Sequence, residues 1–294
     1  RSKSVFVGRK GSGKSAIFIK LIHDLSLDGG LNYNVILKPD SDELLENVEL
    51  SDLYNSERSK KSFFKTVWKY VIYSKLFLLI KDKIQYKHKS LPSYTFSKLE
   101  NEINDFYEIN HNIIGHNFFG AISSINEFIK GKRIVDDPHI LEEFYKKIIG
   151  PMQKMIVEYF NEQKYFNVNI LADNLDKTWE AKNELEIQSE MILSLLEYSN
   201  DIVDEILYKK SEELKVNTII FLRTDIFEYI LKRSREPDKL IVRSYEINWD
   251  KYPELLRKLI EKRFKFTLDI KTKEEIDKVW NDYFNLSENQ HPYD

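Results

Sequence analysis

Short apolar runs recur along the chain, and most are bounded by polar, Gly or Pro residues. Runs of this kind are typical of strands that are buried on both faces of a parallel sheet. We expect five strands, at residues 4–7, 34–39, 166–173, 217–225 and 239–249.

Between these runs, apolar residues recur every three or four positions, which is the spacing of one face of an α-helix. Helices are expected at 14–25 and at about 183–214, and two more in "PELLRKLIEKRFKF" and "KEEIDKVWNDYF". Strands that alternate with helices favour a mainly parallel sheet covered on both faces. We therefore predict an α/β protein with three layers, α/β/α, around a five-stranded sheet.

One long segment interrupts this alternation. From about residue 56 to residue 163, roughly a hundred residues that include "KSFFKTVWKYVIYSKLFLLI", only helical spacing is found. We interpret 56–164 as a large helical insertion that divides the sheet-forming core into 1–55 and 165–265. Residues 266–294 are expected to be a C-terminal helical segment, the start of a further region or a lid. Because the chain starts at Arg1 and not at Met, we expect it to be part of something longer.

The stretch "GRKGSGKS" lies between the first expected strand and the first expected helix, and it holds three of the nine glycines. In the pattern Gly, four residues, Gly-Lys-Ser, backbone N–H groups wrap phosphates, the Lys reaches the β- and γ-phosphates, and the Ser hydroxyl binds Mg²⁺. We predict these roles for Lys14 and Ser15; the alternative is a Gly-rich turn that merely matches. The expected nucleotide contacts are Gly8, Arg9, Lys10, Gly11, Ser12, Gly13, Lys14, Ser15 and Ala16.

Two acids follow the expected strand at 166–173, in "VNILADNLDK". A magnesium ion needs a second anchor beside the loop, at the carboxyl end of a buried strand. We predict that Asp173 is this anchor and acts through water. Asp176 is either a general base for the attacking water or a helix N-cap or turn residue.

The strand "IIFLRTD" ends in Arg223. If this strand lies between the loop strand and the Asp173 strand, Arg223 points at the γ-phosphate and senses it or stabilises charge in the transition state. The alternative is a salt bridge between Arg223 and Asp225 or another nearby carboxylate.

Composition narrows the class of protein. The 294 residues are 42% hydrophobic and 32% charged, which suits a soluble globular domain with a sizeable core. The net charge of −3 gives no overall basic signal for nucleic acid. The absence of Cys excludes disulfides and thiolate chemistry and fits a cytoplasmic protein. The longest apolar run, near 71–80, is too short to cross a membrane, so no membrane partner is expected.

Together, "GRKGSGKS", "ILADNLDK" and "IIFLRTDIFE" resemble the additional-strand P-loop ATPases, and most of all the bacterial STAND and AAA+-like group, which includes many ATPases of anti-phage defence systems. The resemblance covers the sheet segments. It implies a P-loop NTPase that binds ATP with Mg²⁺ and hydrolyses it as a conformational or oligomerisation switch. It also implies a homo-oligomer or an effector partner protein.

The sequence departs from that group in two places. Asp173 lies 159 residues after Lys14, and Asn174 stands where many P-loop ATPases have a Glu that polarises the attacking water. Three readings of Asn174 stay open: Asp176 is the base, hydrolysis is slow, or the base comes from elsewhere.

Other functions are also open. A P-loop kinase of a nucleoside or polynucleotide would use "LKRSREPD" as an Arg-rich lid, and a nucleotide-holding module would turn over little. Lysines interleaved with aromatics at 60–70 suggest a nucleic-acid surface or, more often, an amphipathic helix. His111 and His116 are read as structural. The candidates for an arginine finger that reaches a neighbouring subunit are Arg233, Arg235, Arg243, Arg257 and Arg263.

Overall fold

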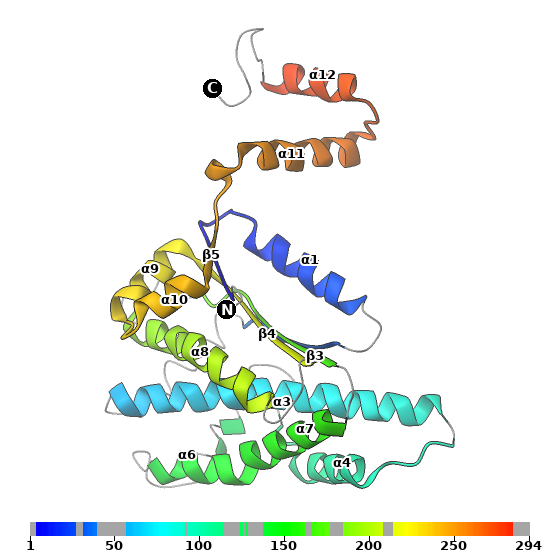
Figure 1. The fold of residues 1–294 in the computed structure, drawn as a ribbon, viewed down its shortest axis with the longest axis vertical. Coiled ribbons are helices and arrows are strands. Elements are labelled where there is room, and N and C mark those ends of the chain that lie inside the picture. Colours follow the sequence, from blue (N-terminus) through cyan, green and yellow to red (C-terminus); the bar gives the residue numbers. More distant parts are fainter. Residues whose placement is uncertain are drawn as a thin grey trace. The chain divides into compact units, whose positions relative to one another are not determined.

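The computed structural model describes residues 4–27, 32–39, 57–91, 93–114, 124–125, 127–128, 138–162, 166–176, 185–207 and 214–284 (Figure 1). The chain forms two compact units, one that ends at Tyr245 and one that begins at Glu246.

In the described part of the chain, five strands form one all-parallel sheet in the order β2-β3-β4-β1-β5. The strands are β1 (Val5–Gly8), β2 (Asn32–Leu37), β3 (Phe166–Ala172), β4 (Leu214–Arg223) and β5 (Ser244–Ile247). The predicted α/β class and parallel five-stranded sheet are therefore confirmed. The central strands are apolar on both sides, as in β3, where every residue except Asn167 is buried.

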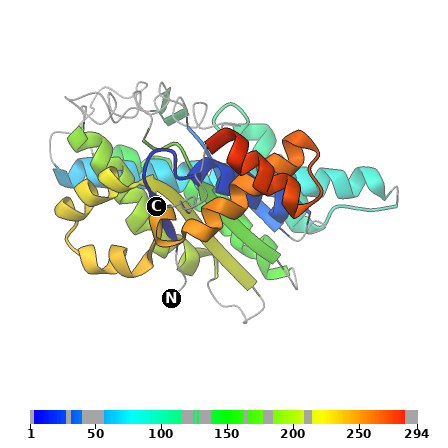
Figure 2. The same cartoon turned by 90° about the horizontal axis from the view of Figure 1, so that it is seen from above.

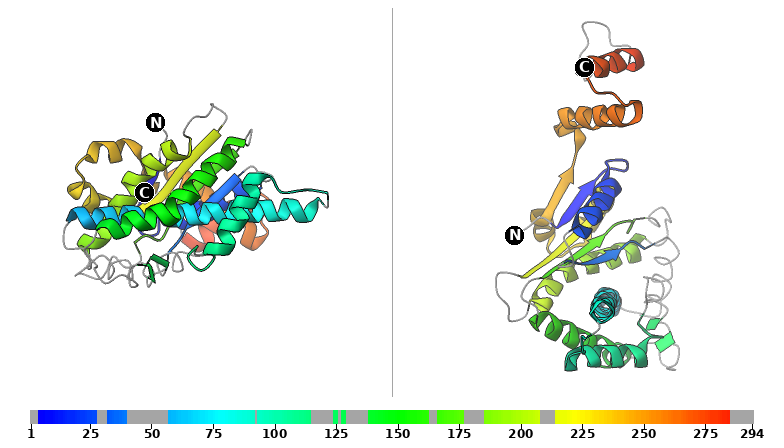
Figure 3. Two further views of the ribbon diagram at one scale, coloured as in Figure 1. Left: turned by 90° about the horizontal axis from the view of Figure 1, so that it is seen from below. Right: turned by 90° about the vertical axis from the view of Figure 1, so that its right-hand side faces the viewer.

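The two faces of the sheet carry different helices. On one face lies α1 (Lys14–Ser26), whose Phe18 ring meets Phe221 of β4 edge to face. On the other face lie α3 (Glu57–Ser90) and α8 (Leu185–Ile206), as the end-on view in Figure 3 shows. The strands run obliquely over α3 in the view from above (Figure 2).

A second helical layer covers the far side of α3. It consists of α4 (Lys98–Asn110), α6 (Pro138–Phe144), the π-helical turn η1 (Tyr145–Ile149) and α7 (Gly150–Glu162), and it lies below α3 in Figure 1. Because α3 has the sheet and α8 on one side and this layer on the other, its middle is buried all round. Trp68 is fully buried and its indole N–H donates to the carbonyl oxygen of Met191 in α8, at 2.9 Å.

The helices of 57–162 thus share one core and one compact unit with the sheet. The division that the sequence suggested, with boundaries at 55, 164 and 265, stays a prediction. The structure places its own division between 245 and 246.

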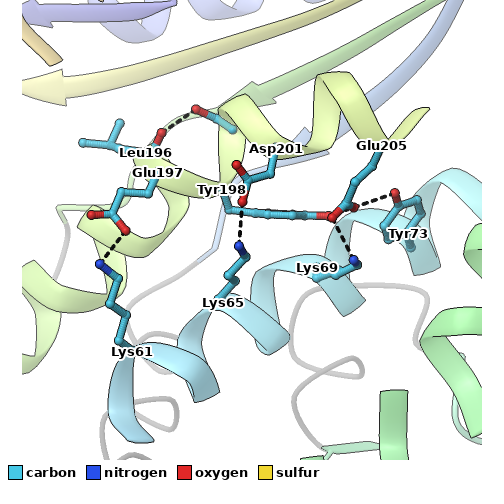
Figure 4. A network of polar contacts seen from close by, with 10 residues as sticks. Lys61, Lys65, Lys69, Tyr73, Leu196, Glu197, Tyr198, Asp201 and Glu205 are labelled. Carbon is cyan, nitrogen blue, oxygen red and sulfur yellow. Dashed lines mark hydrogen bonds and ion pairs between the residues drawn. The ribbon is translucent and has the colours of Figure 1, made fainter. Parts of the chain in front are cut away.

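Basic residues of α3 form a ladder with acids of α8 (Figure 4). The rungs are Lys61–Glu197 at 2.7 Å, Lys65–Asp201 at 2.5 Å and Lys69–Glu205 at 2.9 Å. Both series advance by four residues, so each stays on one face of its helix. The aromatics of this stretch, Phe63, Phe64, Trp68 and Tyr70, are buried in the core. These rings therefore offer no surface to a nucleic acid, and the stretch is an amphipathic helix whose basic residues face the acids of α8.

The chain after β4 differs from the prediction in one respect. Residues 239–249 were expected to be a strand, but the segment begins as α10 (Pro237–Arg243), and only Ser244–Ile247 forms β5. Pro237 in the first turn favours a helix start, because its missing N–H costs nothing there. Between β4 and α10 lies α9 (Thr224–Arg233).

The second unit contains η2 (Trp249–Lys251), α11 (Pro253–Leu268) and α12 (Lys273–Phe284). The rings of Phe264 and Trp280 join the two longer helices, with centroids 5.5 Å apart. Among the residues that the structure describes, no helix is long and apolar enough to span a bilayer.

Candidate functional site

The loop between β1 and α1 has the backbone that its glycines allow. Gly11 and Gly13 have φ of 86° and 89°, in the left-handed region that costs other residues about 1–2 kcal/mol. A Cβ at Gly11 would meet nothing within 4 Å, so the backbone angle, and not crowding, requires glycine there. The turn is closed by the N–H of Ser12, which donates to the Arg9 carbonyl at 3.1 Å.

Lys14 folds back over this loop. Its ammonium donates to the carbonyl oxygens of Gly8, at 2.8 Å, and Arg9, at 2.9 Å. Burial lowers the pKa of the Lys14 ammonium, while the carboxylates of Asp176 and Asp173 act in the opposite direction. The positive charge is thus held at the mouth of the loop, within the field of two acids from another strand end.

Asp173 directly follows β3 and is 3% exposed. Its N–H donates to the Leu37 carbonyl at 3.0 Å, which fixes the residue against the end of β2. Its Oδ2 is buried and accepts no hydrogen bond from the described residues. A buried carboxylate oxygen without a donor costs about 1–3 kcal/mol or more, so this atom suits a cation or an ordered water.

These residues fit the predicted magnesium site. Mg²⁺ is usually bound by one or two carboxylates together with water and substrate phosphates, and not by a cage of protein ligands. Asp173 and Ser15, an exposed residue in the first turn of α1, would supply the carboxylate and hydroxyl oxygens of such a partial set. The described residues contain no group of three or more His, Asp or Glu that could hold a metal ion.

Arg223 ends β4 and pairs in register with Gly8, the first residue of the loop. Its guanidinium donates two hydrogen bonds to Asp225, from Nε to Oδ1 at 3.1 Å and from Nη2 to Oδ2 at 2.6 Å. Its Nε also lies 3.8 Å from Oδ2 of Asp176. The alternative that the sequence left open, a salt bridge to Asp225, is therefore present, and Asp176 joins the same cluster.

Asn174 adopts a left-handed backbone, with φ of 65°. Asn tolerates this region better than most residues with a side chain, and a Glu is rarely found there. The backbone thus gives a physical reason why the residue after Asp173 is not the Glu found in many P-loop ATPases. The sequence signal for this conformation was the Asn itself.

The strand order explains how these groups meet. β4 lies between β1 and β3, so the carboxyl ends of three neighbouring strands bring Lys14, Arg223 and Asp173 to one edge of the sheet. Ligands of open α/β sheets bind at this edge. Sequence reasoning missed Thr224, whose Oγ1 is buried without a partner among the described residues. Because Thr224 directly follows Arg223, the sequence could have placed it among the candidate site residues.

Most of the arginines considered as fingers have partners within their own chain. Arg233 binds Glu186 and Tyr229, and Arg257 binds Glu261 at 2.6 Å. Arg243 is buried and donates to Ser4 and Ser199. Of the two histidines considered, His111 lies 2.9 Å from the carbonyl of Glu108, and His116 is outside the described residues.

A hollow of about 940 Å³ lies at the opposite, amino ends of β1 and β4 and is lined partly by α8 and α10. None of its lining residues belongs to the loop or to the segment 173–176. Several of its charges are already paired, for example Lys65 with Asp201 and Lys239 with Glu236, so we assign it no role in this site.

Comparison with known proteins gave no relatives. No protein-family model matches the chain, and neither a curated protein nor a solved structure matches it.

Proposed function

We propose that the chain binds ATP with Mg²⁺ at the loop of residues 8–16 and hydrolyses it. The observation that carries the proposal is the meeting of Lys14, Arg223 and Asp173 at the carboxyl ends of three adjacent strands. Two left-handed glycines shape the loop there, and a buried carboxylate oxygen of Asp173 has no donor among the described residues. A Gly-rich turn that matched by chance would not need these neighbours.

Each residue has a defined task in this proposal. The N–H groups of the loop and of the first turn of α1 point at the phosphates, at the positive end of the helix dipole. Lys14 exchanges the carbonyls of Gly8 and Arg9 for oxygens of the β- and γ-phosphates. Ser15 and Asp173 hold the magnesium ion, which neutralises charge on the phosphates when it is bound.

Asp176 is the best-placed group to orient the attacking water. It lies in the cluster with Arg223, and its charge acts on Lys14 more strongly than that of Asp173. It is also four residues beyond the end of β3, in the turn that follows the strand. Together with the left-handed Asn174, this favours slow turnover, as suits a switch more than a metabolic enzyme.

Phosphate release tests the proposal. Lys14→Ala should abolish ATP hydrolysis, because a charge-assisted contact to phosphate is worth about 1.5–3 kcal/mol and the Lys also neutralises developing charge. Lys20→Ala is the matched control, since Lys20 lies on the exposed side of the same helix and pairs with Asp24. Equal phosphate release by the Lys14 and Lys20 variants would contradict the site.

The biological use of the hydrolysis rests on the resemblance to STAND and AAA+-like ATPases. A switch that acts on an oligomer or an effector partner, as in anti-phage defence, is our proposal for it. Size measurements in the presence of ATP and of ADP test it, and a single unchanged monomer under both conditions would count against oligomerisation.

A P-loop kinase of a nucleoside or polynucleotide is less well supported than an ATPase. Its proposed lid, "LKRSREPD", contains the end of α9, a turn of three residues and the start of α10, and Arg233 within it is bound to Glu186. A nucleotide-holding module is better supported than the kinase, because Asn174 stands where many P-loop ATPases have a Glu that polarises the attacking water. Product analysis with added nucleosides detects a kinase, and tight binding without phosphate release would indicate a holding module.

A further inference from the structure

Asp225 holds Arg223 in a fork. Two guanidinium nitrogens of Arg223 meet the two carboxylate oxygens of Asp225, at 3.1 and 2.6 Å. Burial acts to raise the pKa of Asp225, but the hydrogen bonds from Arg223 outweigh it and hold that pKa below its usual value. In this state the Arg223 donors that would serve a γ-phosphate are directed at a carboxylate of the protein.

The backbone of Asp225 is anchored, and the longer side chain of Arg223 is the more movable partner. Asp225 lies in the first turn of α9, and Ile226, Phe227 and Ile230 anchor that helix in the core. At the other end of α9, Arg233 binds Glu186 of α8. The Arg side chain is longer and has more rotatable bonds than that of Asp225, so it can reach a new partner without any movement of the backbone.

The pair is also weak enough to break. The side chain of Asp225 is 57% exposed and that of Arg223 is 20% exposed. Pairs so near the surface contribute about 1 kcal/mol or less, while a phosphate group offers more charge and three oxygens. Asp176, 3.8 Å from Nε, keeps the guanidinium beside the loop after release.

We propose that Asp225 is a positioning residue that competes with the terminal phosphate for Arg223, so that a triphosphate, and not a diphosphate, breaks the fork. This inference rests on the proposed function. It adds that the empty and diphosphate-bound states share one Arg223 position and that the triphosphate state has another. The fork then makes the protein less selective for triphosphate than Arg223 alone would allow.

Equilibrium binding of AMP-PNP and of ADP tests the fork. The quantity of interest is the ratio of the ADP dissociation constant to the AMP-PNP dissociation constant. Asp225→Asn should raise this ratio by about threefold to tenfold, because the competing pair is worth about 1 kcal/mol. Arg223→Gln should lower it. A purely structural role of Asp225 at the start of α9 would shift both affinities together and leave the ratio unchanged.

The double variant separates competition from charge alone. Removing a negative charge also favours the more negative ligand through the general field, and that effect would persist in the Arg223→Gln background. Competition predicts that Asp225→Asn changes nothing there. Asp238→Asn, which removes an acid from the first turn of α10, is the matched control and should leave the ratio unchanged.

The outcomes are distinct. An unchanged ratio in Asp225→Asn, or an equal rise with and without Arg223, overturns the fork while the nucleotide site stands. If the wild type binds neither ligand, or if Lys14→Ala binds both as tightly as the wild type, the proposed function fails and the fork with it.

Discussion

The charges at the loop edge and those between α3 and α8 are arranged in opposite ways. Between the two helices each ladder lysine faces one acid, and Glu205 also accepts hydrogen bonds from the hydroxyls of Tyr73 and Tyr198, at 2.9 and 3.0 Å. At the loop edge Asp173 has a buried oxygen to which no residue in the described part of the chain donates, and Arg223 is shared between two acids.

This difference separates groups that support the fold from groups that we propose bind a ligand. Burial raises the pKa values of Tyr73 and Tyr198, and the negative charge of Glu205 raises that of Tyr73 further, so both hydroxyls stay protonated donors. Such a satisfied network specifies how two helices meet. The loop edge instead holds charge at a cost to the fold, which is typical of binding and catalytic sites.

The largest effect is expected from the helix core. Trp68→Ala should lower the free energy of unfolding by about 3–5 kcal/mol, because it leaves a large cavity at the centre of α3. Denaturant unfolding measures it. Lys60→Ala, on the same helix at its partly exposed start, should change stability far less. Similar losses from the two variants would mean that α3 is not the shared core that we describe.

At the loop edge the expected effect falls on binding and not on stability. Asp173→Asn should weaken magnesium-dependent ATP binding by about 1.5–3 kcal/mol, the loss of a charged contact. The same change should leave the unfolding free energy equal or about 1 kcal/mol higher, since the buried oxygen is unsatisfied without a ligand. A variant that loses several kcal/mol of stability would place Asp173 with the structural charges instead.

Lys83 of α3 offers a pH test within the helical region. It lies 3.6 Å from the centre of the Tyr33 ring and donates to the Asn32 carbonyl, and burial lowers its pKa to about 8. The ordinary pKa of a lysine is 10.5. Between pH 8 and pH 10.5 Lys83 therefore binds more protons in the unfolded chain than in the folded one, and the free energy of unfolding rises with pH. Below about pH 8 Lys83 is charged in both states, and the folded state bears the full cost of the buried charge.

The difference in the free energy of unfolding between the wild type and Lys83→Met, measured at several pH values, isolates this contribution. Because Lys83 is only half-buried, we expect this difference in the free energy of unfolding to change by about 1 kcal/mol between pH 8 and pH 10.5. Lys98→Met, at an exposed position, controls for loss of charge. A difference that stays flat from pH 7 to 10 would show that the Lys83 ammonium is as well accommodated as an exposed one.

The smallest effect is expected at the middle rung of the ladder, which is the most exposed of the three. Lys65 and Asp201 are each 49% exposed, so a double-mutant cycle with alanine should give a coupling of about 0.2–1 kcal/mol. The inner rung, Lys69–Glu205, is less exposed and should couple more strongly. Equal couplings would mean that burial and the two tyrosine hydroxyls add nothing to the inner pair.

Much of the fold could be predicted from local sequence patterns. Apolar runs located the five strands to within a few residues, except that α10 was read as part of the last strand. Leu240, Ile241 and Val242 are an apolar run that suits either state, and Pro237 decided for a helix. The partners of α3 could not be predicted, because long-range packing leaves no local pattern.

The candidate site could be proposed from the sequence where a motif requires particular residues at fixed spacing, as in the loop with Lys14 and Ser15. Asp173 and Arg223 followed from their places at strand ends. What could not be predicted was how the charges are shared: the fork between Arg223 and Asp225, its approach to Asp176, and the left-handed Asn174. These depend on side-chain and backbone angles, which spacing does not specify.

The most direct test of the central claim is an equilibrium titration of the wild type with a fluorescent ATP analogue, with Mg²⁺ and then with the metal chelated. We predict one saturable site whose affinity falls when the metal is removed and falls further in Lys14→Ala. Absence of binding, or an affinity that neither chelation nor Lys14→Ala changes, would contradict the account.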